Sequence, residues 1–318
     1  MTVYRPFRNT DPPGIVELWC NHAPQRSLVE PMTVSLLDQR VLSKTYFDRH
    51  GFIVAESDGC LAGFVHAGFG CNEDESDLGT QVGATHMLMV APHEGRDEIA
   101  RQLLTRSEHY LTSGGARTLL AGSVYPANAF YLGLYGGSPS PGLMESDAET
   151  VGLFRNSGYE EVERHCVMQR SLTGFRPIVN RQQMQIRRQY RVESDFDPRP
   201  KTWWEACTIG QMDRVRYRLV SRRDGGDCGS VIFWDMQRVS GSWGVNTMGL
   251  MNLEIVPDLR RQGLATYLVG EALRSMHESG TSLAEAQMDG TNRAAVALFQ
   301  QLGFQNVDTG LVLRKQSS

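Results

Sequence analysis

The stretch PDLRRQGLATYLV, Pro257 to Val269, decides the fold of this chain. It follows the apolar run MNLEIV, which predicts a strand, and it ends in apolar residues at helical spacing, which predict a helix. Gly263 stands at the junction between the two. The first turn of a helix leaves backbone N–H groups without acceptors and carries a partial positive charge. The stretch therefore predicts an anion-binding site at the start of a helix.

The side chains around this junction suit a phosphate group. Gly263 offers no side chain where phosphate oxygens would approach, Ala265 is small, and Arg260 and Arg261 add charge-assisted donors. The pattern Arg/Gln-x-x-Gly-x-Gly/Ala is weak by itself, but its place between a strand and a helix makes it informative. The alternative is that the arginines form only a surface patch at the start of the helix.

The chain also contains an internal repeat. PHEGRDEIARQLL, 92–104, has the same strand-to-helix shape, and its proline aligns with Pro257. Further on, DAETVGLFRNSGY, 147–159, aligns without a gap on NRAAVALFQQLGF, 292–304. We therefore predict two domains, residues 1–172 and 173–318, with about twenty extra residues between the two motifs of the first copy.

Those extra residues fall in or near YPANAFYLGLYGGSPSPGLME, 125–145, whose Gly, Pro and Ser clusters predict a loop. A functional loop is possible from its aromatic content, but we interpret it as a surface insertion. The first copy otherwise predicts a strand at TVYRPF, helices around GIVELWCNHA and SLLDQRVLSKTYF, and a hairpin around Asp58-Gly59. The second copy has only the short WWEACTIGQM before its own hairpin, so its early helices are shortened.

The composition is that of a soluble globular protein, with 41% apolar and 21% charged residues. No apolar run reaches the roughly 18 residues that span a bilayer, and no export signal is recognisable, so we expect a cytoplasmic protein that does not bind membranes. Six scattered cysteines without CxxC or Cys/His spacing predict reduced thiols and no metal site.

Charge is distributed unevenly along the chain. Residues 1–172 carry 13 Lys and Arg against 21 Asp and Glu, a formal charge of −8, whereas residues 173–318 carry 19 against 15, a charge of +4. The basic part could receive a phosphate-bearing molecule and the acidic part a cationic one, unless the parts differ only in surface charge. The acidic overall balance argues against a nucleic-acid partner.

LEIVPDLRRQGLATYLVGEAL and NRAAVALFQQLGF together resemble the two central motifs of the GNAT superfamily of acyl-CoA-dependent N-acetyltransferases. The resemblance covers most of residues 180–318 and, more faintly, 1–172, as in a tandem GNAT protein, an arrangement also found in mycothiol synthase. It implies an α/β (α+β) fold of two tandem domains, each a mixed, twisted sheet with helices on both faces. It also implies acetyl-CoA as co-substrate.

The resemblance assigns roles to residues of the second copy. The amides of the turn would hold the CoA pyrophosphate, the backbone of the preceding strand would pair with the pantetheine arm, and two residues of the second motif would flank the arm and the thioester. The turn comprises Arg261, Gln262, Gly263, Leu264, Ala265 and Thr266, the strand residues are Leu253, Glu254, Ile255 and Val256, and the flanking pair is Asn292 and Phe299.

In the first copy, alignment on the two prolines places Glu98 where the second copy has Gly263. A carboxylate at this place would repel phosphate oxygens. We therefore predict that the first domain has kept the fold and lost the donor site, the alternative being acyl-CoA bound in a shifted mode.

Three positions depart from the family pattern of catalytic groups, because they hold Phe299, Gly249 and Gln287. A base could then come from Glu254, from Glu285 or from the first domain. We predict Glu254 as the catalytic residue, because a carboxylate within NLEIV would be partly desolvated and its pKa raised. The alternative is a solvated Glu254 and an amine that loses its proton to water.

The acceptor implied by the family is an amine on a small molecule or a peptide. The acidic first domain favours a cationic acceptor, and the shortened helices of the second copy lead us to expect that the first domain supplies the missing wall of its pocket. An alternative function, suggested by the missing catalytic groups, is that of a silent acyl-CoA sensor or scaffold.

Overall fold

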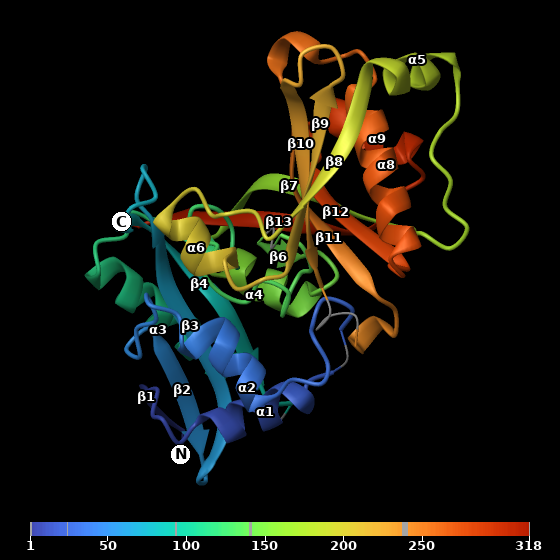
Figure 1. The fold of residues 1–318 in the computed structure, drawn as a ribbon. Helices are drawn as coiled ribbons and strands as arrows, with labels where there is room; N and C mark the ends of the chain where they lie inside the picture. Colours follow the sequence, from blue (N-terminus) through green and yellow to red (C-terminus); the bar gives the residue numbers. More distant parts are fainter. Residues whose placement is uncertain (1, 24, 93, 140–141, 237–240, 318) are drawn as a thin grey trace.

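A computed structural model describes residues 2–23, 25–92, 94–139, 142–236 and 241–317. It contains two α/β lobes that share one continuous sheet (Figure 1), and we call residues 1–172 the first half and 173–318 the second half. The predicted α/β class with two similar units, each with helices on both faces of a mixed sheet, is confirmed.

The main strands and helices follow the same order in both halves. The first half contains β1 (Val3–Pro6), α1 (Pro12–Cys20), α2 (Val34–Leu37), the π-helical turn η1 (Asp38–Leu42), β2 (Phe52–Ser57), β3 (Cys60–Cys71), β4 (Leu78–Val90), α3 (Arg96–Ser113), β5 (Thr118–Ala121), β6 (Leu143–Met144), α4 (Ala148–Asn156) and β7 (Glu160–Ser171). The second half contains α5 (Arg181–Gln189), β8 (Tyr190–Phe196), α6 (Trp203–Ile209), β9 (Arg214–Ser221), β10 (Asp227–Asp235), β11 (Thr247–Ile255), the 3₁₀ turn η2 (Pro257–Leu259), α8 (Leu264–Glu278), β12 (Leu283–Asp289), α9 (Arg293–Gln301) and β13 (Gln305–Gln316). The order differs in α5 before β8 and in β6 after β5.

The second repeated motif is confirmed residue by residue. In the gapless alignment, helices α4 and α9 begin and end at matching positions, and each starts with a side-chain cap, Asp147 in one and Asn292 in the other. The ring of Phe154 packs edge-on against Tyr159, as Phe299 does against Phe304, with centroids 4.9 and 5.1 Å apart. Because the caps and the aromatic pairs fix both ends of each helix, this part of the repeat tolerates no gap.

The two halves exchange their last strands, which the sequence did not predict. The sheet order is β1-β2-β3-β4-β5-β13-β7-β12-β11-β10-β9-β8. Strand β13, the end of the second half, therefore pairs with β5 of the first half, while β7, the end of the first half, pairs with β12 of the second. The antiparallel pair β7–β13 lies at the centre of the order, and neither half completes its sheet with its own strands.

Helices cover the two faces of the sheet unequally. In the first half, successive residues of β2 and β3 point to opposite faces of the sheet. Phe52 and Phe64 pack with residues of α1 and α2 on one face. Ala55 and Val65 pack with residues of α3 on the other. In the second half the inward residues of β9, β10 and β11 pack under α8 and α9. Towards its other face, the second half offers the seven-residue α6, which is shorter than α1 and α2 with η1 in the first half, as predicted.

Helix α6 packs against the first half, as Figure 1 shows. The Thr202 hydroxyl donates to a Glu75 carboxylate oxygen at 2.6 Å, and Lys44 Nζ donates to the carbonyl oxygens of Cys207 and Thr208 at 2.8 and 3.3 Å. Lys44 thus satisfies the last carbonyls of α6, although it is only 8% exposed. Burial lowers the pKa of the Lys44 ammonium to about 8.

The strand exchange predicts that the halves fold only together. We expect fragments 1–172 and 173–318 to be unfolded or aggregated when expressed separately, because each lacks a central strand of its sheet. Co-expressed, they should form a 1:1 complex with the circular dichroism of the intact chain. A monomeric fragment 173–318 with a cooperative unfolding transition would contradict this.

Lys44 predicts a specific dependence of stability on pH. Between about pH 8 and its unfolded pKa of about 10.4, the unfolded chain keeps a proton that the folded protein has released, so stability should rise with pH. The rise should amount to at most about 3 kcal/mol and should be reduced in Lys44→Met. Urea unfolding of both proteins at pH 7.5 and 10 measures this rise. An equal change in the free energy of unfolding in the wild type and in Lys44→Met would contradict the prediction.

Candidate functional site

The sheet opens in the second half where β11 and β12 part. Their parallel pairing is confined to Thr247–Gly249 against Leu283–Glu285. Beyond that point β11 continues to Ile255 with β10 as its recorded partner, and β12 continues to Asp289 against β7. The edge of β11 that faces β12 is thus available to an extended ligand, which could pair with its backbone as an added strand.

The predicted phosphate turn closes the open end of β11. Gly263 has a φ of 81° and directly precedes α8, and Arg261 has a φ of 64°, which is unusual for a residue with a side chain. No side chain caps α8, and within the described ranges no acceptor is recorded for the amides of residues 261–266. These amides are therefore available as donors, and their predicted role in holding an anion stays a prediction.

Helix α5 touches this turn without covering its amides. Gln182 Nε2 donates to the Gln262 carbonyl at 3.1 Å, and Gln183 Nε2 donates to the Gly263 carbonyl at 3.4 Å. In a trans peptide the carbonyl and the N–H group point in opposite directions. Contacts to the Gln262 carbonyl therefore leave the Gly263 amide on the other side of the turn.

The remaining predicted donor residues lie around the same opening. Ile255 is buried in the core, Leu253 is partly buried against it, and Val256 is 40% exposed at the end of the strand. Asn292 uses its side-chain oxygen to cap α9, accepting from the Ala295 amide at 3.1 Å. Phe299 is 3% exposed and packs in the core. The contacts of Asn292 and Phe299 are structural, and their predicted roles beside a ligand stay predictions.

Glu254, the predicted catalytic residue, lies in a different environment from the one expected. It is exposed, whereas its neighbour Ile255 is buried towards α8, so the Glu254 side chain points to the opposite face of the sheet. There it lines a groove with Arg216 and Arg218. The expected desolvation is therefore wrong, because the Glu254 side chain is exposed.

The buried carboxylate of the opening is Glu285, which is 1% exposed. It is in register with Gly249, at the last paired position before the strands part, and lies two residues before Gln287, the position at which the resemblance implied an acid. Its oxygens accept from Gln169 Nε2 at 2.7 Å, the Ser138 amide at 2.8 Å and Gln287 Nε2 at 3.1 Å. Burial raises the pKa of Glu285, and these hydrogen bonds and the charge of Arg26 oppose the rise.

The loop 125–145 reaches Glu285 from the first half, so its interpretation as a surface insertion is wrong. Gln287 Nε2 donates to the Gly136 carbonyl at 2.7 Å, and Trp234 Nε1 donates to the Ser138 hydroxyl. Gly137 lies so close to Glu285 that a Cβ there would collide with the carboxylate. Most of the loop is buried, because it fills the space between the halves that the short α6 leaves open.

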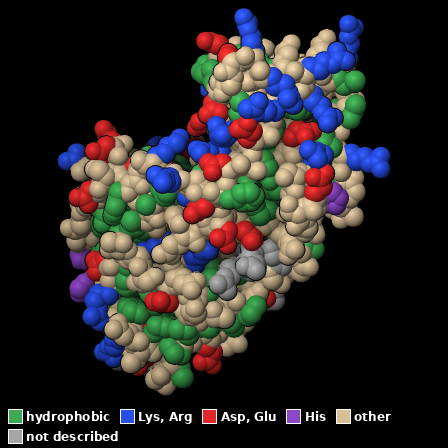
Figure 2. Space-filling view, viewed as in Figure 1, with side chains coloured by type: hydrophobic (Ala, Val, Ile, Leu, Met, Phe, Trp, Pro, Cys, Tyr) green, Lys and Arg blue, Asp and Glu red, His purple; other side chains and the backbone are tan. Residues whose placement is uncertain are grey.

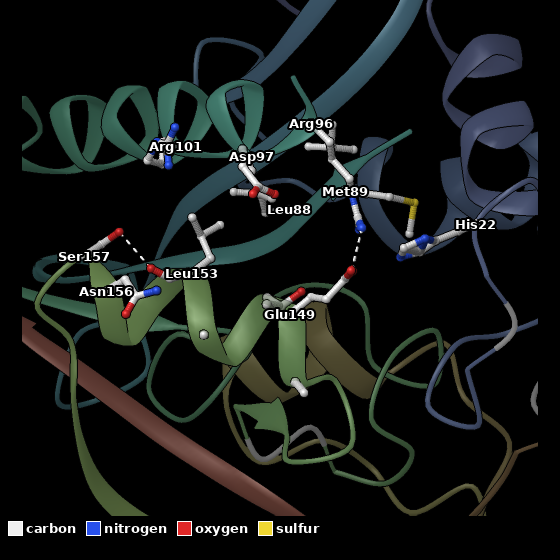
Figure 3. Close-up of a pocket in the computed structure, with 15 residues that line it drawn as sticks. His22, Leu88, Met89, Arg96, Asp97, Arg101, Glu149, Leu153, Asn156 and Ser157 are labelled. Atoms are coloured by element: carbon white, nitrogen blue, oxygen red, sulfur yellow. Dashed lines mark hydrogen bonds and ion pairs between the residues drawn. The ribbon is translucent and has the colours of Figure 1, made fainter. Parts of the chain in front are cut away.

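The first half has a cavity of about 430 Å³ between the end of β4, α3 and α4 (Figure 3). These elements correspond to β11, α8 and α9, which surround the opening in the second half. Helix α3 begins after Gly95, with a φ of 84°, so Gly95 corresponds to Gly263 and the alignment of Gly263 on Glu98 is wrong. The three-residue η2 turn precedes Gly263 and has no counterpart among the described residues before Gly95. Helix α3 is in turn three residues longer than α8. In the sequence, Gly95 was the residue that could have indicated the correct alignment with Gly263.

With this correction, carboxylates still occupy the first turn of α3. Asp97 and Glu98 take the places of Ala265 and Thr266. Arg96 forms an ion pair with Glu149 of α4 at 2.6 Å, and Figure 3 shows the two side chains meeting across the gap between the helices. The first half thus keeps the cleft but crosses it with an ion pair, and the lining of the cleft combines Asp97 and Glu149 with Arg96 and Arg101.

The first half also lacks the buried carboxylate. When the strands are aligned on Pro92 and Pro257, Ala84 takes the place of Gly249 and Leu120 takes the place of Glu285. Ala84 and Leu120 are in register with each other, as Gly249 and Glu285 are. Leu120 packs in a small apolar cluster. The same backbone frame therefore holds an apolar site in one half and an acidic one in the other.

The neighbour of this position differs between the halves as well. The alignment of α4 on α9, continued into the strands that follow them, pairs Gln169 with Arg314. Arg314 lies in register with Leu120, as Gln169 lies in register with Glu285. Gln169, which donates to Glu285, thus corresponds to an arginine, and no side-chain amide takes its place beside Leu120.

Within the described ranges, no helix has the length and apolar character needed to cross a bilayer. In the same part of the chain, no group of three or more His, Cys, Asp or Glu side chains is placed to hold a metal ion. All six cysteines are free thiols.

Comparisons with known proteins agree with this architecture. The sequence profile of the acetyltransferase (GNAT) family matches residues 17–135 and again 182–304. The chain therefore belongs to the GNAT acetyltransferase family, with one match in each half. No curated protein matches the sequence significantly.

Solved structures show the same fold at low sequence identity. A tandem GNAT protein from the clavulanic acid biosynthesis pathway is 14% identical, with a TM-score of 0.68 over 100% of this chain and 99% of its own. The glucosamine N-acetyltransferase region of a fungal multi-domain β-N-acetylglucosaminidase is 14% identical, with a TM-score of 0.71 over 99% of this chain and 38% of its own. A GCN5-related N-acetyltransferase from Sphaerobacter thermophilus is 13% identical, with a TM-score of 0.62 over 99% and 95%.

Proposed function

We propose that this protein is an acetyl-CoA-dependent N-acetyltransferase with its donor site in the second half and an amine as acceptor. The observation that carries the proposal is the buried carboxylate of Glu285, which lies where β11 and β12 part. Family membership supports acetyl transfer in general. The choice of half rests on the differences in side chains at matching positions.

The second half is equipped to hold an acyl-CoA. The amides of residues 261–266 are available for the pyrophosphate, and the open edge of β11 from Leu253 to Val256 suits the pantetheine arm. In the first half, Asp97 stands at the place of Ala265 and would repel a phosphate, and the Arg96–Glu149 ion pair crosses the cleft.

Glu285 suits the role of general base better than Glu254 does. The amine nitrogen attacks the thioester carbonyl, the C–S bond breaks, and the amine proton passes to the carboxylate of Glu285. A raised pKa makes a carboxylate a more effective base. The departing thiolate needs little help from an acid, because a thiol pKa near 8.5 makes it an adequate leaving group, so Phe299 in place of an acid is no obstacle.

The acceptor would approach Glu285 from the face that the first half covers. Gly136 and Ser138 lie directly on the carboxylate and its neighbour Gln287, so this loop would form part of the acceptor wall and move when an acceptor binds. The formal charge of −8 on the first half favours a cationic acceptor. The similar fold of a glucosamine N-acetyltransferase region makes amino sugars a reasonable addition to a panel of polyamines, aminoglycosides and basic peptides.

The donor site predicts the effect of copying the first half into the second. Ala265→Asp should weaken acetyl-CoA binding at least tenfold in calorimetry, because the new carboxylate faces the pyrophosphate. The matched control, Asp97→Ala in the first half, should leave the dissociation constant unchanged. Tighter binding in the control would point to a donor in the first half, and unchanged binding in Ala265→Asp would contradict a donor site in the second half.

Glu285 predicts the pH dependence of the reaction. Release of free CoA with an active amine should increase as pH rises through the raised pKa of Glu285, since the ionised form is the base. Glu285→Gln should lower kcat about 100-fold or more, while Glu254→Gln should not. Melting temperatures should show that both variants are folded. Full activity of Glu285→Gln would refute the assignment, and acetyl-CoA binding without turnover of any amine would leave a silent sensor.

A further inference from the structure

Helix α5 belongs to the connection between the halves, and its chemistry differs from that of its surroundings. Its sequence RQQMQIRRQ contains three arginines and no acidic residue. Arg and Lys side chains gather at this end of the molecule, as Figure 2 shows around the position that α5 has in Figure 1. The contacts of Gln182 and Gln183 with the carbonyls of the phosphate turn fix α5 directly beside that turn.

A groove of about 320 Å³ runs between α5, the segment 177–179 and the outer face of α8. Two of its lining residues are unusually exposed for apolar side chains, Val179 at 80% and Met184 at 54%. Thr266, in the first turn of α8, lies at its boundary with the phosphate turn. The groove therefore begins where the amides of the turn end.

The charges of the groove favour an anion. Arg187 lines it and forms no ion pair within the described ranges. Glu271 forms an ion pair with Arg274 at 2.8 Å, and Arg274 also pairs with Glu278 at 2.7 Å outside the groove.

The groove that contains Glu254 also adjoins the turn, but its charges suit a phosphate less well. Its Arg216 and Arg218 are paired with carboxylates, and its third arginine, Arg260, donates Nε to the Ile255 carbonyl at 2.9 Å. Glu254 itself has no recorded cationic partner in the described part of the chain and would repel a phosphate. Of the two grooves, the one beside α5 is therefore the better place for an anionic group.

We propose that this groove between α5 and α8 is the subsite for the 3′-phosphoadenosine end of the acyl-CoA donor. The adenine would lie against Val179 and Met184, and the 3′-phosphate would bind the guanidinium of Arg187. The assignment rests on the proposed donor site, since it places the nucleotide beyond a pyrophosphate held by the turn. It gives the linker between the halves a part in donor selection.

The test compares acetyl-CoA with 3′-dephospho-acetyl-CoA by calorimetry. Arg187→Gln should weaken acetyl-CoA binding about tenfold and leave 3′-dephospho-acetyl-CoA unaffected, because a charged hydrogen bond contributes about 1.5 kcal/mol or more. The matched control is Arg188→Gln on the same helix, which removes the same charge from a residue that does not line the groove. It should change neither affinity.

A second variant tests the adenine contact. Met184→Ser should weaken both ligands by a similar factor, about threefold to tenfold, since the apolar contact does not involve the 3′-phosphate. Equal effects of Arg187→Gln and Arg188→Gln, or a wild type that binds both ligands equally, would overturn the subsite alone. A wild type that binds neither ligand would overturn the proposed donor site itself.

Discussion

The antiparallel pairing of β7 with β13 is the interaction on which the rest of this structure depends. Each of these strands ends one half and completes the sheet of the other. Backbone groups of a central strand that lost its neighbour would be buried without partners, which is costly. The exchange therefore holds the halves in one arrangement and makes each half part of the other.

That arrangement explains how the first half reaches the site of the second. Gln169 lies on β7 and contacts Glu285 only because β7 pairs with β12. The loop 125–145 follows β5, and the same arrangement brings its Gly136 and Ser138 onto Glu285 and Gln287. Of the groups that stabilise the charge of Glu285, Gln169, Ser138 and Arg26 belong to the first half and Gln287 to the second. The acidic site is thus a property of both halves.

The sequence predicted the local parts of this structure well, and the candidate site less well. The strand-turn-helix around Gly263, the gapless match of α4 with α9 and the short α6 all follow from nearby residues. The exchange of β7 and β13 was not predictable, because two repeated strands with similar patterns can pair within a half or between halves. The apolar run NLEIV favoured Glu254, but a loop distant in sequence covers Glu285 instead. Burial by a remote segment leaves no mark on neighbouring residues.

The internal repeat supplies an argument about Glu285 that a single domain could not. A buried carboxylate destabilises a fold unless donors compensate its lost hydration, and here an amide of a distant loop and two glutamines are arranged to do so. The first half builds the same strand position with Leu120, in an apolar cluster, and its strands pair in the matching register. Since the shared frame forms without a charge at this position, the carboxylate is not required by the fold. Its presence where the strands part, at the opposite end of the opening from the turn with available amides, is better explained by chemistry at that opening.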